Sequence, residues 1–366
     1  MLEVLILTEY KRNMIAPLNL FLLLFVSRTL IGFTVSSAVL KSGYTFDLVF
    51  STLAALAIVC VVSIPAVKLS VSGNGLLENK FLSVLYAVYF VYSGAINISK
   101  FALFSSTELN QNAKMMFFAG FMILVCTYAS SLGTEAISRF GSMVFVIILI
   151  GVLGVMIAGA GEFSTLNLFP LVQNSRDAFL SNILFSVTST NEIVLLIGLS
   201  PKINGNIIKP FYSALALSYV AGIVLIIFAI GVLGDTASLS AYPLFEVSQL
   251  SKLNTGERLE AVFTAFWIFA VFLKISLFLS CASSCVEKTG LLNLNLVKKL
   301  SKDAKRHTVS SVVCGVAMFL ISWAILYGTA FEKAENMLVY IPFVVFAFII
   351  PLGYLLFGGK KKNENS

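Results

Sequence analysis

Apolar blocks of about twenty residues dominate the sequence, and short segments between them carry most of the charges. A helix of about twenty residues crosses the hydrocarbon core of a bilayer. Lipid cannot hydrogen-bond to exposed backbone groups, so each block must be helical. The sequence therefore predicts an all-α membrane protein. Ten spans are expected, at about 15–38, 44–67, 81–104, 114–132, 142–160, 178–200, 210–234, 259–283, 308–328 and 337–358.

Composition favours the same class. Hydrophobic residues make up 58% of the chain and charged residues only 12%, whereas about a quarter of the residues of a soluble domain are charged. The net charge of +7 does not indicate nucleic-acid binding, because Lys and Arg lie in gaps between the spans. The chain has five cysteines, all in or beside apolar blocks, and one histidine. No metal site and no cofactor are expected from this set.

Orientation follows from the basic residues, which are enriched on the cytoplasmic side of membrane proteins. With the N-terminus inside, the inner segments hold 16 Lys and Arg and the outer loops hold 7, with Lys100 counted among the outer ones. Both termini are therefore expected in the cytoplasm, as an N-terminal tail at 1–14 and a basic tail at 359–366. The permease-like domain would fill 15–358.

Two connections are longer than a tight turn needs. The outer one, about 235–258, is moderately apolar and is expected to carry a short surface helix. The inner one, 284–307, is strongly basic. It is either a solvated loop of the kind that the positive-inside rule predicts, or a contact for anionic lipid or an acidic partner.

Three ionisable side chains, Arg28, Glu192 and Lys274, lie well inside predicted spans. Each costs about 2.5–3.5 kcal/mol at the centre of a membrane helix, which makes them functional candidates. At 1.5 Å per residue, Glu192 and Lys274 lie about 21 and 22 Å from the outer starts of their spans, and Arg28 lies at another depth. We therefore predict a Glu192–Lys274 pair. Arg28 would either snorkel or bind carbonyls of a broken helix.

Polar runs interrupt two spans near their middles. In span six the run extends from Ser186 to Glu192, and in span one it includes Ser27 to Thr29 and Gly32. Such side chains compete with helical hydrogen bonds, so span six is either broken there or continuous with its hydroxyls bonded back to the preceding turn. If the chain forms two repeats, at about 15–160 and 178–358, the two runs correspond. Paired interruptions of this kind indicate a transporter-type binding site.

Span three places Tyr89, Ser93 and Asn97 on one helical face, either as the wall of a cavity or as a packing stripe. The candidate ligand-binding residues share a polar side chain, or backbone freedom, near the middle of spans one, three, six and eight. They are Arg28, Gly32, Ser93, Asn97, Thr188, Thr190, Asn191, Glu192 and Lys274.

Several longer motifs resemble one known family, the GerAB-type spore germination permeases. They are IAPLNLFLLLF before span one, GTEAISR, the GE and NLFP after span five, TNEIVLLIGLSPKI, YPLFEVSQL, and ERLEAVFTAFWIFAVFLKISLF. Members of that family are the B subunits of nutrient germinant receptors, within the amino acid–polyamine–organocation transporter superfamily. The motif residues singled out as structural are Gly133, Glu135, Arg139, Tyr242, Pro243, Glu257, Arg258 and Trp267.

The resemblance implies a LeuT-like fold of ten helices in two inverted repeats, with helices one and six broken. It also implies the inner membrane of a bacterial endospore, and a complex with an A subunit and a lipoprotein C subunit. The nutrient, commonly an amino acid, would bind between spans one, three, six and eight. Arg28 departs from the neutral, glycine-rich break expected of such proteins, and its charge favours a carboxylate ligand.

The leading hypothesis is a germinant sensor. A working amino-acid transporter, proton-coupled or facilitative, and an ion-conducting receptor subunit are the alternatives, because all three need a similar pocket. An enzyme is not expected, since the sequence shows no Ser–His or metal constellation.

Overall fold

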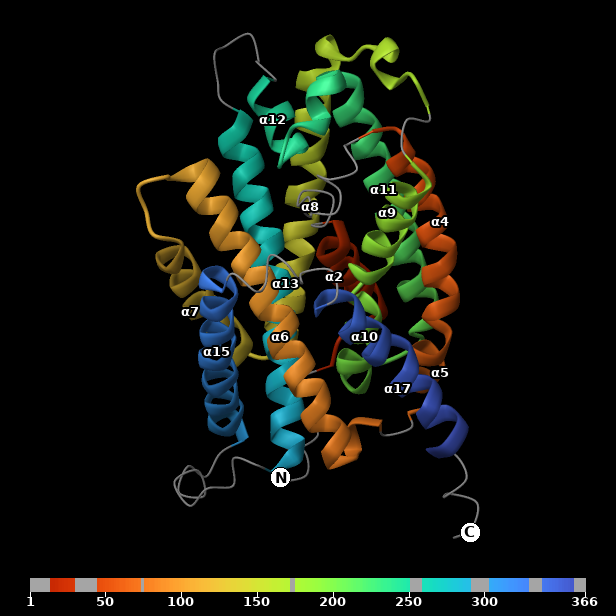
Figure 1. The fold of residues 1–366 in the computed structure, drawn as a ribbon. Helices are drawn as coiled ribbons and strands as arrows, with labels where there is room; N and C mark the ends of the chain where they lie inside the picture. Colours follow the sequence, from red (N-terminus) through yellow and green to blue (C-terminus); the bar gives the residue numbers. More distant parts are fainter. Residues whose placement is uncertain are drawn as a thin grey trace.

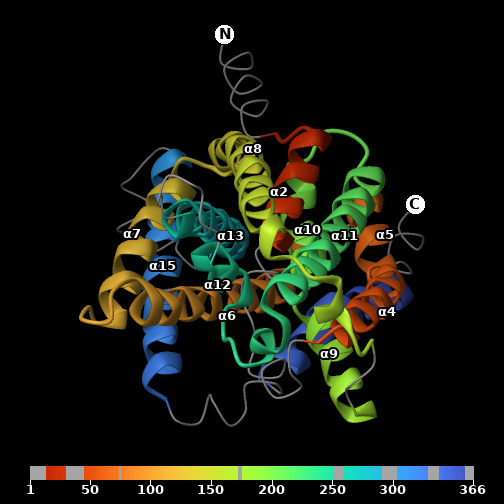
Figure 2. The same ribbon diagram turned by 90° about the horizontal axis from the view of Figure 1, so that it is seen from above.

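The computed structural model describes residues 14–29, 45–73, 76–171, 175–250, 259–290, 303–328 and 338–358. Within these ranges the regular structure is helical, apart from an isolated bridge between Ile15 and Ile203. Figure 1 shows a bundle of long, mostly upright helices, and Figure 2 shows the same bundle from above. Among the described residues, eight helices are long and apolar enough to cross a membrane, and two further apolar helices are shorter. Each of the ten predicted spans contains a described helix, although the second half of span one, 30–38, lies outside the described residues.

The first five spans contain six α-helices. These are α2 (Pro17–Thr29), α4 (Asp47–Val62) with α5 (Ile64–Ser72), α6 (Lys80–Phe104), α7 (Met115–Ser131) and α8 (Thr134–Gly159). Span two is divided because Pro65 follows the first residue of α5, and proline lacks the N–H that would continue the helical ladder.

The second five contain α9 (Arg176–Thr188) with α10 (Glu192–Leu199), α11 (Ile208–Leu233), α13 (Leu259–Thr289), α15 (Asp303–Tyr327) and the span Leu338–Phe357, which includes α17 (Ile350–Gly353). A further helix, α12 (Pro243–Leu250), lies between α11 and α13. Short 3-10 and π turns complete the set: η2 (Leu76–Glu78), η3 (Ser105–Leu109), η4 (Ala160–Glu162), η5 (Thr165–Leu168), η6 (Ser200–Lys202), η7 (Gly234–Ser238), η8 (Val345–Ile349) and η9 (Tyr354–Gly358).

Several boundaries differ from the predicted ones. The helix of span five begins at Thr134 instead of 142, α13 continues to Thr289 instead of 283, and α15 begins at Asp303 instead of 308. Both ends of the predicted loop 284–307 are therefore helical. Lys, Arg and Glu are good helix formers, so a helix can extend beyond the apolar layer that the prediction used as its limit.

The helix expected in the outer connection is present as α12, but it is packed into the fold instead of lying on the surface. Pro243, Leu244, Phe245 and Val247 are all buried. Its apolar face rests on α11 and α13, which the sequence pattern could not show.

The centre of the bundle is α13, which packs against α6, α8, α15 and α7 (Figure 2). The start of α2 and the end of α10 lie together, because the Ile15 N–H donates to the Lys202 carbonyl at 2.7 Å. Close packing of α10 depends on Gly198, where a Cβ would lie 2.8 Å from Cys281 Sγ and 2.9 Å from the Phe90 ring. The Gly198 contacts hold the end of α10 that lies away from the span-six break against α6 and α13.

Candidate ligand-binding site

Span six is interrupted at 189–191, between α9 and α10, so the predicted break is confirmed and the continuous helix is not found. The Thr190 N–H bonds to the Val187 carbonyl at 3.0 Å, which is three residues back instead of four. The Ser186 carbonyl therefore loses its usual partner in the helical ladder. The polar run favours this outcome because its side chains can bind backbone groups that a helix would otherwise use.

Three side chains bind the released Ser186 carbonyl. Arg28 Nη2 donates to it at 3.3 Å, the Tyr219 hydroxyl at 3.2 Å and Thr190 Oγ1 at 3.0 Å. The Arg28 guanidinium also lies over the Tyr219 ring, 4.4 Å from its centroid. Of the two alternatives for Arg28, binding to a broken-helix carbonyl is therefore the one that the structure shows. Cation–π stacking adds to this contact.

The predicted pair between Glu192 and Lys274 is present. Lys274 Nζ lies 3.1 Å from Glu192 Oε1, and the two side chains are only 2% and 0% exposed. Lys274 also donates to the Ser27 carbonyl at 3.1 Å, and Ser27 Oγ donates to Glu192 Oε1 at 2.7 Å. This cluster joins the end of α2, the start of α10 and the middle of α13. A buried charge needs such pairing because its desolvation is expensive.

One expectation about depth was wrong. The helix-rise estimate separated Arg28 from the Glu192–Lys274 pair, but the residue before it, Ser27, contacts both members. Arg28 therefore lies near the level of the pair. The estimate assumed helices perpendicular to the membrane with known starting points, and tilted or broken helices do not meet that assumption.

Glu192 retains unused hydrogen-bonding capacity. Its Oε1 accepts both bonds of the cluster, while Oε2 is buried and has no hydrogen-bond partner among the described residues. An unsatisfied buried oxygen costs free energy. The site can therefore accept one further donor at this carboxylate.

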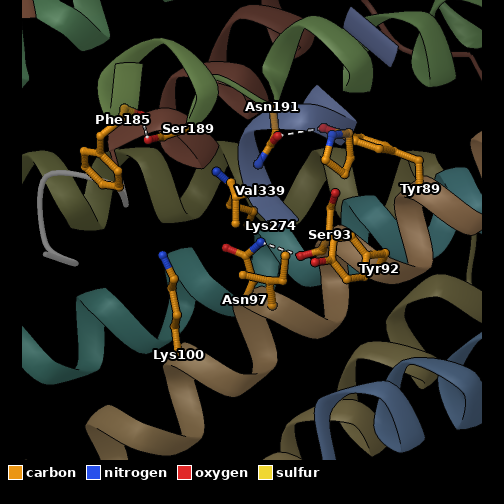
Figure 3. A pocket seen from close by; sticks show the side chains of 12 residues that line it. Tyr89, Tyr92, Ser93, Asn97, Lys100, Phe185, Ser189, Asn191, Lys274 and Val339 are labelled. Carbon is orange, nitrogen blue, oxygen red and sulfur yellow. Dashed lines mark hydrogen bonds between the residues drawn. The ribbon is translucent and has the colours of Figure 1, made fainter. Parts of the chain in front are cut away.

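A polar cavity opens beside the break, where α6, α13 and the last span meet it (Figure 3). Together with its mouth, the cavity has a volume of about 660 Å³. Its inner space is about 60 Å³. That inner space is enough for a few waters. The residues that line it are Tyr89, Tyr92, Ser93, Ile96, Asn97, Lys100, Phe185, Ser189, Asn191, Lys274, Val339 and Pro342.

The face of α6 that carries Tyr89, Ser93 and Asn97 forms one wall of this cavity. Of the two interpretations of this face, the structure therefore shows a cavity wall and not a packing stripe. The Tyr89 hydroxyl donates to Asn191 Oδ1 at 2.8 Å, and Asn97 Nδ2 donates to the Ser93 carbonyl at 2.8 Å (Figure 3). Lys100, counted above with the outer loops, instead lies within α6 and lines the cavity.

The structure does not place the remaining candidate residues in the lining of the cavity. Thr190 faces Tyr219 instead of the cavity, at 2.8 Å, and Thr188 bonds back to the Leu184 carbonyl at 2.7 Å. Gly32 lies outside the described residues.

Sequence reasoning omitted Ser27, Tyr89 and Tyr219 from the candidate set. Ser27 belongs to the polar run of span one, and Tyr89 belongs to the polar face of span three. Tyr219 follows Ser218 in a span whose other polar pair is Tyr212 and Ser213, and the Ser218–Tyr219 pair was the available signal.

The YPLF and Trp motif residues brace the fold beside the site. Trp267 is buried. It stacks on Phe101, with ring centroids 5.6 Å apart, and packs at a tilt against Phe104, with centroids 4.2 Å apart. Tyr242 meets Phe104 edge-on at 4.8 Å, and Pro243 begins α12. Burial raises the pKa of Tyr242 to about 12, so its hydroxyl stays protonated at neutral pH. These contacts hold α12 onto α6 and α13.

The GTEAISR motif lies at the start of α8. Gly133 adopts φ +94°, a conformation that favours glycine, where the chain turns into the helix. Glu135 and Arg139 form an ion pair at 2.7 Å, with the Arg139 side chain 78% exposed. An exposed pair of this kind contributes little stability. Glu257 and Arg258 lie outside the described residues.

Comparisons with solved structures identify the fold. Mhp1, a nucleobase-cation-symport-1 family transporter in a closed conformation with bromovinylhydantoin bound, matches with a TM-score of 0.62 and 13% identity. The match covers 95% of this chain and 79% of that one. A Na⁺-coupled sialic acid symporter in a substrate-bound outward-open state matches with a TM-score of 0.55 and 14% identity, over 90% and 79%. At these identities the likeness shows the fold alone, which is the LeuT fold of such transporters.

Sequence comparison identifies the family. No curated protein matches the chain significantly. A family model described as spore germination protein matches residues 68–325, which is more than half of the chain. That range includes the helix break, the cavity face of α6 and the α13 lysine. The chain belongs to the spore germination protein family of GerAB-type permeases.

Proposed function

We propose that this chain is the subunit of a nutrient germinant receptor that binds a small ligand, most simply an amino acid, in the cavity beside the span-six break. The observation that carries the proposal is the convergence of α6, the break and α13 on one polar cavity. Discontinuous helices supply ligand sites in transporter folds because their freed backbone groups and polar side chains face a cavity. Membership of the spore germination protein family supports the receptor setting that we propose, an endospore inner membrane with A and C partner subunits.

The charges of the cavity favour a ligand with a carboxylate. Lys274 and Lys100 both line it, and an ammonium attracts a carboxylate strongly where water is excluded. The Ser93, Asn97 and Asn191 side chains supply neutral hydrogen-bonding groups around the same space. An amino acid presents a carboxylate for the lysines and an ammonium for oxygen acceptors.

The small inner space explains how binding could signal. An inner space of about 60 Å³ is far smaller than a typical ligand pocket of about 300–1,000 Å³. A ligand must therefore stabilise a more open conformation than the one described. Binding one conformation better than the other is what shifts a population, and partner subunits could detect that shift.

The test is direct binding to the purified chain in lipid nanodiscs. Single amino acids are titrated while the melting midpoint and the heat of binding are recorded. We expect saturable binding of at least one amino acid, with Asn97→Leu and Asn191→Leu weakening it by about tenfold or more, because each leaves buried polar groups of the ligand unpaired. Thr188→Val is the control, since Thr188 bonds only within α9. No saturable binding, or equal loss in the control, would contradict the proposal.

The alternative function is transport of the same ligand, which the fold of the solved symporters favours. Uptake of labelled amino acid into proteoliposomes separates the two. Binding without concentrative uptake supports the receptor, whereas uptake driven by a proton or sodium gradient supports the transporter. Both results are interpretable because the binding measurement is made on the same preparation.

A further inference from the structure

A large apolar groove lies between α7 and α15, away from the cavity described above. The two helices pack side by side at one edge of the bundle (Figures 1 and 2). The groove has a volume of about 600 Å³ and an almost wholly apolar lining. Leu124, Tyr128 and Val316 line it and are 70%, 66% and 56% exposed. It therefore opens outward, toward the lipid.

Small residues make the groove deep. A Cβ on Gly315 would lie 2.5 Å from Thr127 Oγ1, so the α15 backbone approaches α7 closely at the middle of the groove. Gly120 lies near the far end of the groove and has no side chain. A Cβ there would meet only the Phe319 ring, at 3.7 Å. The close approach of α15 to α7 at Gly315 forms the bottom of the groove. Because the two glycines have no side chains, the space above the bottom stays open.

The length of the groove limits what can occupy it. On α15 the lining runs from Thr308 to Phe319, a distance of eleven helical steps, which is about 16 Å at 1.5 Å per residue. One leaflet contributes about half of the ~30 Å hydrocarbon core. A partner's membrane-spanning helix would continue across both leaflets. The groove instead matches an acyl chain of a single leaflet.

One end of the groove is polar and lies beside basic sequence. Ser131 and Thr308 line that end. The first turns of α15 carry Lys305 and Arg306, and His307 separates them from Thr308 in the sequence. The six basic residues from Lys288 to Arg306 make this the predicted cytoplasmic end. Basic residues beside a groove between membrane helices favour an anionic headgroup.

We propose that α7 and α15 bind an anionic phospholipid of the basic, cytoplasmic leaflet. One acyl chain fills the groove and the phosphate headgroup lies at the Ser131 and Thr308 end. The lipid covers an apolar face that the described residues leave open. The site is independent of the amino-acid cavity, and the proposal does not rest on the proposed function.

The test uses the full chain, purified in detergent and stripped of lipid. Dioleoylphosphatidylglycerol and dioleoylphosphatidylcholine are titrated separately, while native mass spectrometry counts retained lipid and melting curves report stabilisation. We expect tighter binding of phosphatidylglycerol. Lys305→Gln with Arg306→Gln should weaken that binding by at least about fivefold and leave phosphatidylcholine unchanged, since each basic residue near a membrane surface contributes about that factor.

Groove-filling variants test the acyl chain separately. Val316→Trp and Gly120→Leu should reduce the binding of both lipids, and using two sites guards against a folding defect in either variant. Val146→Trp, at a 51%-exposed position of α8, and Lys360→Gln with Lys361→Gln, in the C-terminal tail, are the matched controls and should change neither.

Three results would overturn the proposal. The first is equal binding of the two lipids, which would mean a neutral occupant. The second is an equal loss in the tail control, which would mean unspecific charge attraction. The third is retention of neither lipid by the native chain, which would mean that no phospholipid occupies the groove.

Discussion

The buried ion pair between Glu192 and Lys274 can be tested by removing its charges singly and together. Glu192→Gln and Lys274→Met keep the approximate size of each side chain. In the native cluster Lys274 Nζ contacts Glu192 Oε1 and the Ser27 carbonyl, each at 3.1 Å, and neither charged side chain is more than 2% exposed. Each single change therefore leaves one buried charge without its counter-ion.

The expected magnitudes differ sharply between the single and double variants. Leaving one partner of a buried pair uncompensated costs about 3–5 kcal/mol, a large part of a typical stability of about 5–15 kcal/mol. Replacing a whole buried pair by neutral groups is often nearly neutral, and the amide oxygen that Glu192→Gln introduces could still accept a hydrogen bond from the Ser27 hydroxyl. The double variant should thus recover most of the loss, with a coupling of about 3 kcal/mol or more.

The assay compares membrane abundance and the melting midpoint in detergent for the native chain, both single variants and the double variant. The matched control is the same cycle, Glu135→Gln and Arg139→Met, at the exposed pair of α8. That control should show less than about 1 kcal/mol of coupling. Strictly additive losses at Glu192 and Lys274 would mean that the two side chains do not interact, and would refute the buried ion pair. Ligand response need not recover in the double variant.

Three further predictions use other features. Gly151→Ala should destabilise the protein by about 1–3 kcal/mol, because its Cβ would overlap the Phe266 ring, whereas Gly154→Ala in the same helix meets nothing and should be neutral or stabilising; melting midpoints check both. A topology reporter fused after Lys362 should be active only in the cytoplasm, and activity outside would refute the span count. Ligand affinity should be equal in sodium and potassium buffers, because the Lys274 ammonium would repel a cation near α2; sodium-dependent binding in calorimetry would show that reasoning to be wrong.

Much of the site could be predicted because lipid penalises charge and exposed backbone. The charged side chains of Glu192 and Lys274 would cost too much free energy if they faced lipid. The sequence therefore predicted that they pair with each other, and the pair is present. The polar run of span six predicted its break in the same way. Arg28 was harder, because several acceptors at different depths could satisfy it, and its Tyr219 partner lies 191 positions away in the sequence.

The amino-acid pattern alone was enough to predict the membrane class, the order of the apolar helices, the interruption of span six and the ionisable residues that must face inward. These follow from local energetics: how long an apolar block is, and what each residue costs in hydrocarbon. Only the tertiary structure decided which groups meet. It placed Lys100 in the cavity wall, turned Thr190 toward Tyr219, buried α12 and opened the groove between α7 and α15. Those outcomes depend on helix rotation, tilt and close approach at small residues, which are properties of pairs of helices and are absent from any single span.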